Sequence, residues 1–214
     1  MEKILITYFG AFGGQDINPS MLAVDLLPDK INGVNLIKKE LAVEFEKSTE
    51  QLSDYFAEID PSAVVCVGLA GGRAELTVER VAINLNDARI PDNSGFQPID
   101  VKILANNAPD AYFSKLPIKA MAQQSQQVGV PASVSNTAGT YVCNHVMYLA
   151  CHWASQKSGK KAGFIHVPFV PEQTAGKTGV ATMHLDDIVK GLTAMIEAIL
   201  DFEDDIRVTG GAEH

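Results

Sequence analysis

The chain has 214 residues, of which 46% are hydrophobic and 20% charged, as expected for one globular domain and not for a disordered chain. Its 26 acidic and 17 basic residues give a formal net charge of −9, and a surface of that sign repels nucleic acid. No stretch approaches the ~18 apolar residues of a membrane span, and no secretory signal is visible. The three cysteines form no CxxC pair, which fits a reducing cytoplasm. We therefore expect one cytoplasmic domain over 1–214, frayed from about Val208, with neither nucleic acid nor membrane as partner.

The first half of the chain alternates apolar runs with amphipathic segments. Residues 3–8 predict a buried strand, and Asn18 followed by Pro19 is typical of a capped helix start. That helix is expected to reach about Leu27. The further elements predicted up to residue 85 are a strand over 33–42, a helix over 47–58, and strands over 63–69 and 76–85. The run at 63–69 has no polar side chain, as in a strand buried on both faces.

The second half begins with a segment, 86–115, that is rich in Asn, Asp, Pro and Gly. Long irregular segments inside compact domains often carry a site. The elements predicted after it are helices over 117–127, 141–156 and about 184–200, and strands over 131–135 and 162–167. Strands that alternate with helices predict an α/β fold, a three-layer α/β/α sandwich with a twisted, mostly parallel sheet. Sites in such folds usually lie at the carboxyl ends of the strands.

One cysteine, Cys143, follows a strand and a turn. With Thr140 as N-cap, Cys143 falls near the third position of the helix over 141–156. There a thiol faces unpaired amides and the positive end of the helix dipole, which lowers the thiol pKa, and the same amides can hold an oxyanion. An unpaired cysteine is also a common core residue, so inert packing stays open as the alternative.

The other two cysteines are expected to be inert. Cys66 lies among valines in the middle of a predicted strand, which is typical of core packing. Cys151 follows Cys143 by eight residues, so it lies ~12 Å further along the helix axis and cannot share a metal ion with it.

Five histidines compete as the base that would serve Cys143. His145 points ~200° away from it on the same helix, and His152 lies ~13.5 Å along that helix. His184 begins the last helix, as a cap or a surface group. His166 ends a strand that we expect to be parallel to, and next to, the strand that leads to Cys143. His166 is therefore the candidate base, with a structural histidine as the alternative.

A third group must accept a hydrogen bond from the imidazole and orient it. Glu79 lies among apolar strand residues and fits this role, although a surface pair with Arg80 is equally consistent with the spacing. Arg89, in the irregular segment, either stabilises negative charge in a site or forms a loop salt bridge with Asp87 or Asp92.

Together these residues make the chain resemble the pyroglutamyl peptidase I family, also called pyrrolidone carboxylate peptidases. The resemblance covers nearly the whole chain in a conserved order of segments, which is far more specific than a single motif. The segments are FGG with NPS at 12–20, AGGR at 70–73, ERVAIN at 79–84, DARIPDN at 87–93, AYF and LP at 111–117, SNTAGTYVCNH at 135–145 and GFIHVPFVPEQ at 163–173.

The resemblance implies a cysteine peptidase that hydrolyses the amide bond after an N-terminal pyroglutamyl residue through a thioester, with no metal or organic cofactor. It implies a triad of Glu79, Cys143 and His166, with Arg89 beside the oxyanion. The family's substrate pocket implies binding roles for Phe9, Phe12, Leu69 and Val142. Flat apolar walls suit a pyroglutamyl ring, which has no free amine and no charge. The family also implies a homotetramer or homodimer, with the 86–117 region as a contact surface.

The first loop departs from the family pattern. Tyr8 replaces a small residue, Gly10 an acidic one and Ala11 a proline, and Leu69 stands where a glutamine is common. These changes leave open the shape of the pocket. Two alternatives therefore remain: a non-catalytic pyroglutamyl-binding protein with the same fold, and a phosphate-dependent nucleoside-processing enzyme that uses Gly13 and Gly14 as an anion loop.

Overall fold

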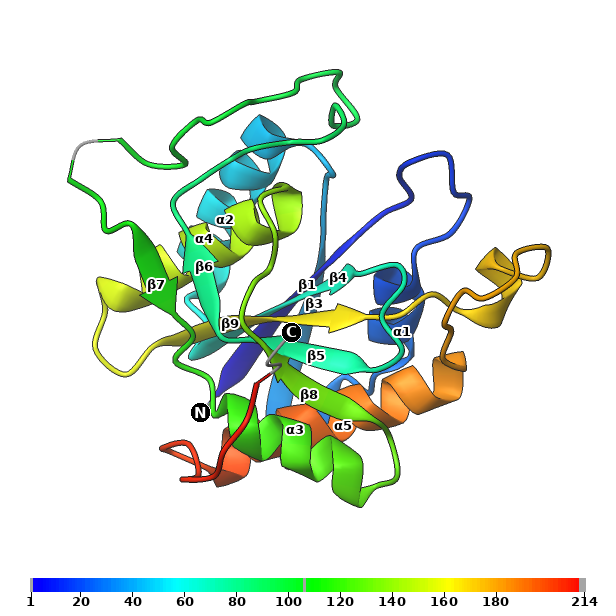
Figure 1. Ribbon diagram of the computed structural model, residues 1–214. Helices are drawn as coiled ribbons and strands as arrows, with labels where there is room; N and C mark the ends of the chain where they lie inside the picture. Colours follow the sequence, from blue (N-terminus) through cyan, green and yellow to red (C-terminus); the bar gives the residue numbers. More distant parts are fainter. Residues whose placement is uncertain (1, 106, 212–214) are drawn as a thin grey trace.

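A seven-stranded sheet crosses the middle of the molecule (Figure 1). The computed structural model describes residues 2–105 and 107–211, and its sheet has the order β2-β3-β1-β4-β9-β5-β8. Strands β3, β1, β4 and β9 are mutually parallel, whereas β2, β5 and β8 run the other way. The bounds are β1 Lys3–Phe9, β2 Lys30–Ile31, β3 Val34–Leu41, β4 Ala63–Leu69, β5 Leu76–Glu79, β8 Ala132–Ser135 and β9 Lys161–Val167.

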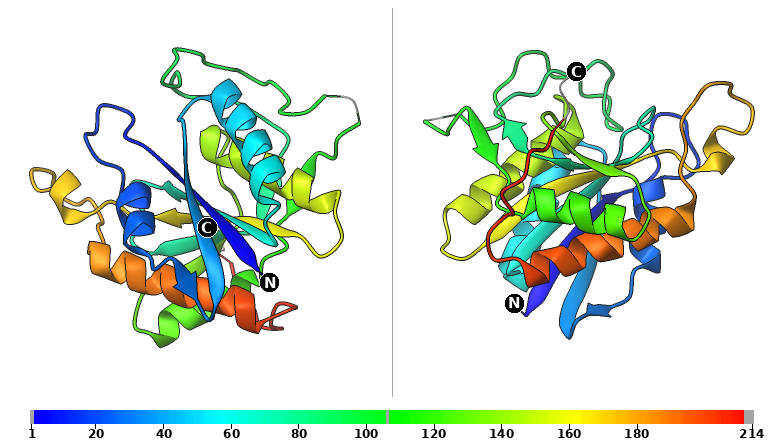
Figure 2. Two further views of the ribbon diagram at one scale, coloured as in Figure 1. Left: turned by 180° about the vertical axis from the view of Figure 1, so that it is seen from behind. Right: turned by 60° about the horizontal axis from the view of Figure 1, so that its bottom comes forward.

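Helices cover both faces of this sheet, so the predicted three-layer sandwich is confirmed (Figures 1 and 2). One face packs against α1 (Pro19–Leu26), α3 (Ile118–Gln127) and α5 (Leu185–Asp201), and the other against α2 (Phe45–Ile59) and α4 (Val142–Ser155). Strand β1 shows why its run is apolar throughout: Ile4 and Ile6 enter one core cluster, whereas Leu5 and Phe9 enter the other. No helix in the described part of the chain is both long and apolar enough to cross a membrane.

The strand predicted over 76–85 is wrong, because the chain leaves the main sheet at Arg80. Strand β5 ends at Glu79, and β6 (Val81–Ile83) then pairs antiparallel with β7 (Ala111–Phe113) in a separate two-stranded sheet. The side chain of Asn144 on α4 bonds both the amide and the carbonyl of Ile83, each at 2.9 Å. This polar anchor, which a strand pattern does not reveal, draws the chain out of the sheet toward α4. The segment predicted to be irregular, 86–115, is so over most of its described length, but it contains β7, which is too short for its side chains to show a period.

The two predicted helix caps differ in outcome. At α1, the Asn18 side chain accepts from the amide of Ser20 at 3.0 Å and Pro19 is the first helical residue, so this cap is confirmed. At α4, the Thr140 cap is wrong: the helix begins at Val142, and the Thr140 hydroxyl donates instead to the carbonyl of Asp87 at 2.7 Å. Thr140 therefore ties the start of α4 to the irregular segment.

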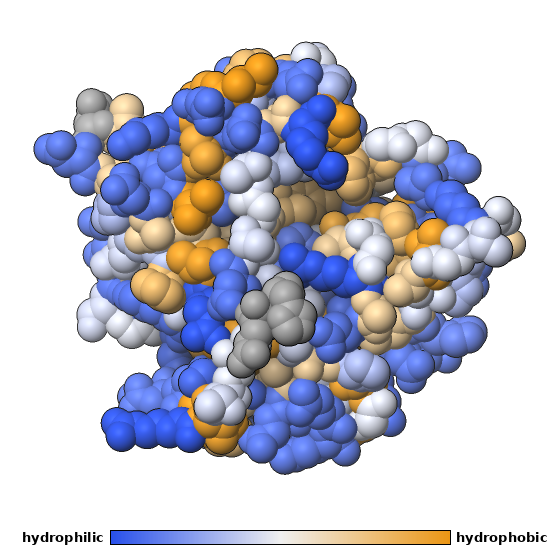
Figure 3. All heavy atoms as spheres, in the orientation of Figure 1, coloured by the Kyte–Doolittle hydropathy of each residue, from blue (hydrophilic) through white to orange (hydrophobic). Residues whose placement is uncertain are grey.

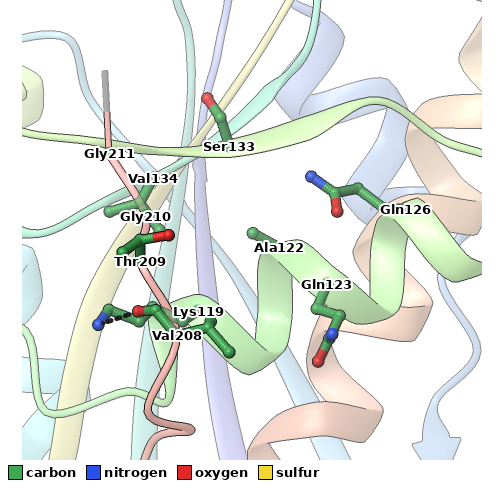
Figure 4. A pocket seen from close by; sticks show the side chains of 10 residues that line it. All are labelled: Lys119, Ala122, Gln123, Gln126, Ser133, Val134, Val208, Thr209, Gly210 and Gly211. Carbon is green, nitrogen blue, oxygen red and sulfur yellow. Dashed lines mark hydrogen bonds between the residues drawn. The ribbon is translucent and has the colours of Figure 1, made fainter. Parts of the chain in front are cut away.

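The tail after α5 lies along α3 and β8 (Figure 4). It borders a cavity of about 280 Å³, and Lys119 Nζ donates to the carbonyl of Val208 at 2.6 Å. Further up the chain, Asp205 accepts from the amides of Lys119 and Ala120 at 3.0–3.1 Å. Pro117, which precedes α3, has no side chain that accepts a hydrogen bond, so Asp205 supplies the missing cap. The expected fraying stays a prediction, because residues 212–214 lie outside the described residues.

Removing this distant cap should destabilise the protein. Asp205→Ala is expected to lower the free energy of unfolding by about 1–2 kcal/mol, because the first amides of α3 lose their acceptor and the helix start loses a negative charge. Urea unfolding followed by circular dichroism measures this change. Asp204→Ala, at the exposed neighbouring carboxylate, is the matched control, and an equal loss in both variants would contradict the capping role.

Candidate active site

A carboxylate and an imidazole meet inside the main sheet. Glu79 ends β5 and His166 lies near the end of β9, and His166 Nδ1 is 2.7 Å from Glu79 Oε1. The side chains are buried, with exposed fractions of 0% for Glu79 and 4% for His166. Because Nδ1–H donates to the carboxylate, Nε2 of the ring is left as the acceptor.

The strand arrangement that brings this pair together differs from the expected one. β9 and β8 are not neighbours, because β5 lies between them and runs antiparallel to β9. The expectation that His166 ends a strand next to the one leading to Cys143 is therefore wrong. The register pairs Thr77 with His166, so Glu79, two residues on, reaches the ring diagonally from the same face.

Cys143 approaches His166 across the face of the sheet, as the second residue of α4. Its sulfur lies over Gly68 of β4, which is the register partner of His166. A Cβ at Gly68 would be 3.1 Å from Cys143 Sγ and 2.7 Å from Phe164 Cζ, so the thiol occupies space that only glycine leaves free. The first helical hydrogen bond runs from His145 N–H to Tyr141 O, so the amide of Cys143 is not needed within the helix.

Burial dominates the electrostatics of the thiol. The pKa of Cys143 is raised to about 12, first by burial and then by the negative charge of Glu79, and the opposing effects of Arg73 and the backbone amide are smaller. The expected lowering of this pKa is therefore wrong, because loss of hydration outweighs the helix start. Burial also lowers the pKa of His166, against the raising influence of Glu79. Both shifts favour the uncharged forms of the two side chains in the free protein.

Cys143 and His166 open into a common cavity of about 380 Å³. Figure 3 shows the apolar hollow on this face of the molecule, beneath the overhanging irregular segment. Arg89 lines the same cavity and is exposed. Within residues 2–105 and 107–211, no ion pair joins Arg89 to Asp87 or Asp92, so its charge faces the cavity solvent rather than a loop carboxylate.

A narrow apolar slot opens beside the thiol. Cys143 lines it together with the predicted pocket residues Phe9, Phe12, Leu69 and Val142, and with three that the sequence did not single out, Asn18, Val43 and Tyr141. Its volume, about 20 Å³, is roughly that of one water molecule. The slot adjoins the large cavity, since Phe12, Leu69, Tyr141 and Cys143 line both.

The unusual Tyr8 does not form this slot. Side chains alternate along β1, so Phe9 points toward α2 and α4, whereas Tyr8 packs against the core cluster on the opposite face. Leu69 does line both the slot and the large cavity. Of these two replacements, only Leu69 therefore bears on the walls that a substrate would touch.

Comparisons with known proteins agree with this geometry. The family model described as pyroglutamyl peptidase matches residues 2–202. The chain belongs to the pyroglutamyl peptidase family. It is 52% identical over 211 residues to a pyrrolidone-carboxylate peptidase of Alkaliphilus oremlandii, covering 98% of this chain and 99% of that one.

Solved structures of the pyroglutamyl peptidase family have the same fold. The pyroglutamyl peptidase I from Bacillus amyloliquefaciens matches with a TM-score of 0.92 and 40% identity, over 98% of this chain and 100% of that one. The pyrrolidone carboxyl peptidase from Thermococcus litoralis also has a TM-score of 0.92, with 38% identity and the same coverage.

The remaining thiols lie where the sequence predicted. Cys66 is fully buried and its burial raises the thiol pKa to about 12. Cys151 is buried on α4 beside the carbonyl of Ala162.

The other described histidines, His145, His152 and His184, have partners or positions away from Cys143. His152 Nδ1 is 2.8 Å from the Tyr112 hydroxyl, and His184 is exposed before α5. His145 is buried, with Nδ1 3.1 Å from Asn86 Oδ1 and Nε2 2.7 Å from Thr49 Oγ1. It links α2, α4 and the irregular segment.

The structure adds one charged residue that sequence reasoning did not select. Arg73 Nη1 donates to Glu79 Oε1 at 2.7 Å, the same oxygen that accepts from His166. The alternative pairing of Glu79 with Arg80 is wrong, because Arg80 Nη2 donates to the carbonyl of Gly210. No periodicity signals Arg73; its only sequence signal is its place directly after two glycines that close a turn.

The buried His145 predicts a pH dependence of stability. Burial lowers its pKa from 6.5 to about 4. Between these values the unfolded chain binds a proton that the folded protein does not, so the free energy of unfolding falls as the pH falls. Replacing His145 with Gln should reduce the loss of stability between pH 7 and pH 5 by about 2 kcal/mol.

Urea unfolding at the two pH values measures this effect. His184→Gln removes an exposed histidine and serves as the control, which should keep the wild-type dependence. A wild-type dependence in His145→Gln would contradict the prediction.

Proposed function

We propose that this member of the family hydrolyses the amide bond that follows an N-terminal pyroglutamyl residue, as a cysteine peptidase. The observation that carries the proposal is the buried Glu79–His166 pair, whose imidazole lines the same cavity as the thiol of Cys143 at a helix start. A nucleophile, a base and a group that orients the base are the parts that acyl transfer needs.

The first step transfers the acyl group to sulfur. As Cys143 Sγ attacks the pyroglutamyl carbonyl, Nε2 of His166 takes the thiol proton, so the ion pair forms only during attack. Glu79 stabilises the imidazolium through Nδ1–H. The carbonyl oxygen becomes an oxyanion, which the free amides at the start of α4 and the charge of Arg89 stabilise. The C–N bond then breaks as His166 returns the proton to the leaving amine.

The second step releases the pyroglutamyl group. A water molecule loses a proton to His166 and attacks the thioester carbonyl, and the C–S bond breaks as sulfur recovers a proton. The apolar slot beside Cys143 suits the uncharged lactam, since Phe9 and Phe12 offer aromatic surface and backbone groups can pair with the ring amide. The large cavity leaves room for the rest of the peptide.

Loss of the nucleophile tests this proposal. Cys143→Ala should abolish hydrolysis of a pyroglutamyl chromogenic amide, whereas Cys151→Ala, which removes a buried thiol from the same helix, should retain it. The wild-type protein should cleave the pyroglutamyl amide in preference to the matching prolyl and alanyl amides, and a thiol-alkylating agent should stop the reaction. Full turnover by Cys143→Ala would overturn the assignment. Binding of pyroglutamate without hydrolysis by the wild type would favour a non-catalytic protein.

We further propose that copies of the chain associate, and that they do so in the cytoplasm. Five large apolar side chains in the segment from the end of β6 to the end of β7 are exposed: Ile90 at 49%, Phe96 at 46%, Ile99 at 67%, Val101 at 45% and Phe113 at 70%. Exposed apolar groups of this kind are typical of protein contact surfaces. The three free thiols fit a reducing compartment.

The association has its own test. Light scattering after size-exclusion chromatography should give a mass that is a multiple of the chain mass, and the double variant Ile99→Ser with Phe113→Ser should lower it. Leu26→Ser is the control, because Leu26 is 57% exposed on α1, in a different layer of the fold. A monomeric wild type would contradict the proposal.

A further inference from the structure

Arg73 stands at the end of a tight turn between β4 and β5. The turn closes with hydrogen bonds from Ala70 N–H to Val167 O at 2.9 Å and from Arg73 N–H to Ala70 O at 3.3 Å. The turn requires glycine at two positions, for different reasons. A Cβ at Gly71 would be 2.4 Å from the ring of Phe169, and Gly72 has a φ of +93°, which favours glycine. The turn thus directs Arg73 back along the face of β5.

The guanidinium of Arg73 joins three parts of the site. Nη1 donates to Glu79 Oε1 at 2.7 Å and also to the hydroxyl of Thr77, the register partner of His166. Nη2 donates to the carbonyl of Thr137 at 3.3 Å, in the turn that precedes α4 and Cys143. Its planar fork of donors therefore spans from the strand of Glu79 to the turn leading to the nucleophile.

We propose that Arg73 is a positioning residue for the reaction: it holds the Glu79 carboxylate ionised and fixed, and through Glu79 it orients the imidazole of His166. This inference rests on the proposed function. It assigns no substrate contact to Arg73. The two cavities beside Cys143 are lined by other residues, including Arg89, whereas Arg73 lies behind Glu79.

The carboxylate needs this second donor. Glu79 Oε1 accepts from both His166 and Arg73, while Oε2, within the described residues, is buried without a hydrogen-bond donor. The nearby Ser135 hydroxyl, which also lowers the pKa of Glu79, donates to the carbonyl of Thr137 at 3.1 Å. Burial alone raises the pKa of Glu79, and His166, Ser135 and Arg73 together reverse that effect. Without Arg73, the buried Glu79 carboxylate would have His166 as its one strong hydrogen-bond donor, and its charge would be poorly compensated.

The charge of Arg73 also acts on His166. Burial is the largest influence and lowers the pKa of His166, Glu79 raises it, and Arg73 lowers it. The titratable or charged groups around the ring are Glu79 from β5, Arg73 from the β4–β5 turn, Cys143 from α4, and Asp87 and Arg89 across the cavity. Removing the Arg73 charge removes an effect that lowers the pKa of His166, while the raising effect of Glu79 remains. The pKa of His166 should therefore rise.

The experiment compares Arg73→Met and Arg73→Lys with Arg80→Met. Arg80 is the control because it follows Glu79 in the sequence but donates to Gly210. Arg73→Met should lower kcat roughly ten- to hundred-fold, as expected for one charge-assisted hydrogen bond, with KM unchanged. The acid limb of its kcat/KM profile should move to higher pH. Arg73→Lys should keep the wild-type limb, because the charge remains, but lose part of kcat, because one ammonium cannot reach both Glu79 and Thr137.

Two results would overturn the inference. In the first, the acid limb of the kcat/KM profile of Arg73→Met stays where it is in the wild type, and kcat falls only in proportion to the fraction of active sites that can still be titrated. The variant would then simply contain fewer folded sites. The other is a rise in KM at constant kcat, which would make Arg73 a substrate contact. If Arg73→Met does not fold, Arg73→Lys provides the test. An unchanged acid limb together with a reduced kcat supports the positioning role, and an unchanged kcat contradicts it.

A second readout separates this inference from the proposed function. The NMR titration of the His166 ring, assigned with His166→Gln, needs no substrate. An upward shift of its pKa in Arg73→Met supports the positioning role even in a protein that cleaves no pyroglutamyl amide, and an unshifted titration contradicts the role even in an active enzyme.

Discussion

One buried hydrogen bond, between the Glu79 carboxylate and the His166 imidazole, sets the terms for the rest of the site. An ionised carboxylate inside a sheet is costly unless donors surround it. The antiparallel register of β5 and β9 supplies the first donor, and the glycine turn after β4 supplies the second. The same bond fixes which ring nitrogen faces the cavity, and so decides which atom can take a proton from sulfur.

Loss of hydration, rather than position at a helix start, has the largest effect on the pKa of the Cys143 thiol. A thiolate at a helix N-terminus is stabilised when water or cations reach it. At Cys143, on the first turn of α4 against the sheet, loss of hydration and the negative charge of Glu79 are the two largest influences, and both raise the thiol pKa. These influences favour the uncharged thiol in the free protein. A resting thiol is also less exposed to alkylation and oxidation, since the thiolate is the reactive form.

The layers and most of the elements could be predicted from the sequence, because they depend on local periodicity. The break at Arg80 and the reversal of β5 could not, since both are decided by contacts between residues far apart in the sequence, such as the anchor that Asn144 offers to Ile83. His166 was chosen on a strand adjacency that is wrong, yet it lines the same cavity as Cys143. The partner of Glu79 was missed for the same reason: Arg80 is its neighbour in sequence, whereas Arg73 is its neighbour in space.

The narrow slot beside Cys143 has a consequence for ligand discrimination. A flat, uncharged lactam could pack against Phe9 and Phe12 without giving up the hydration of a charge. A charged amino terminus placed there would lose its hydration, and no acidic side chain among the residues that line the slot would replace it. Discrimination at such a slot would rest on the charge that its walls cannot solvate as well as on the surface that they offer.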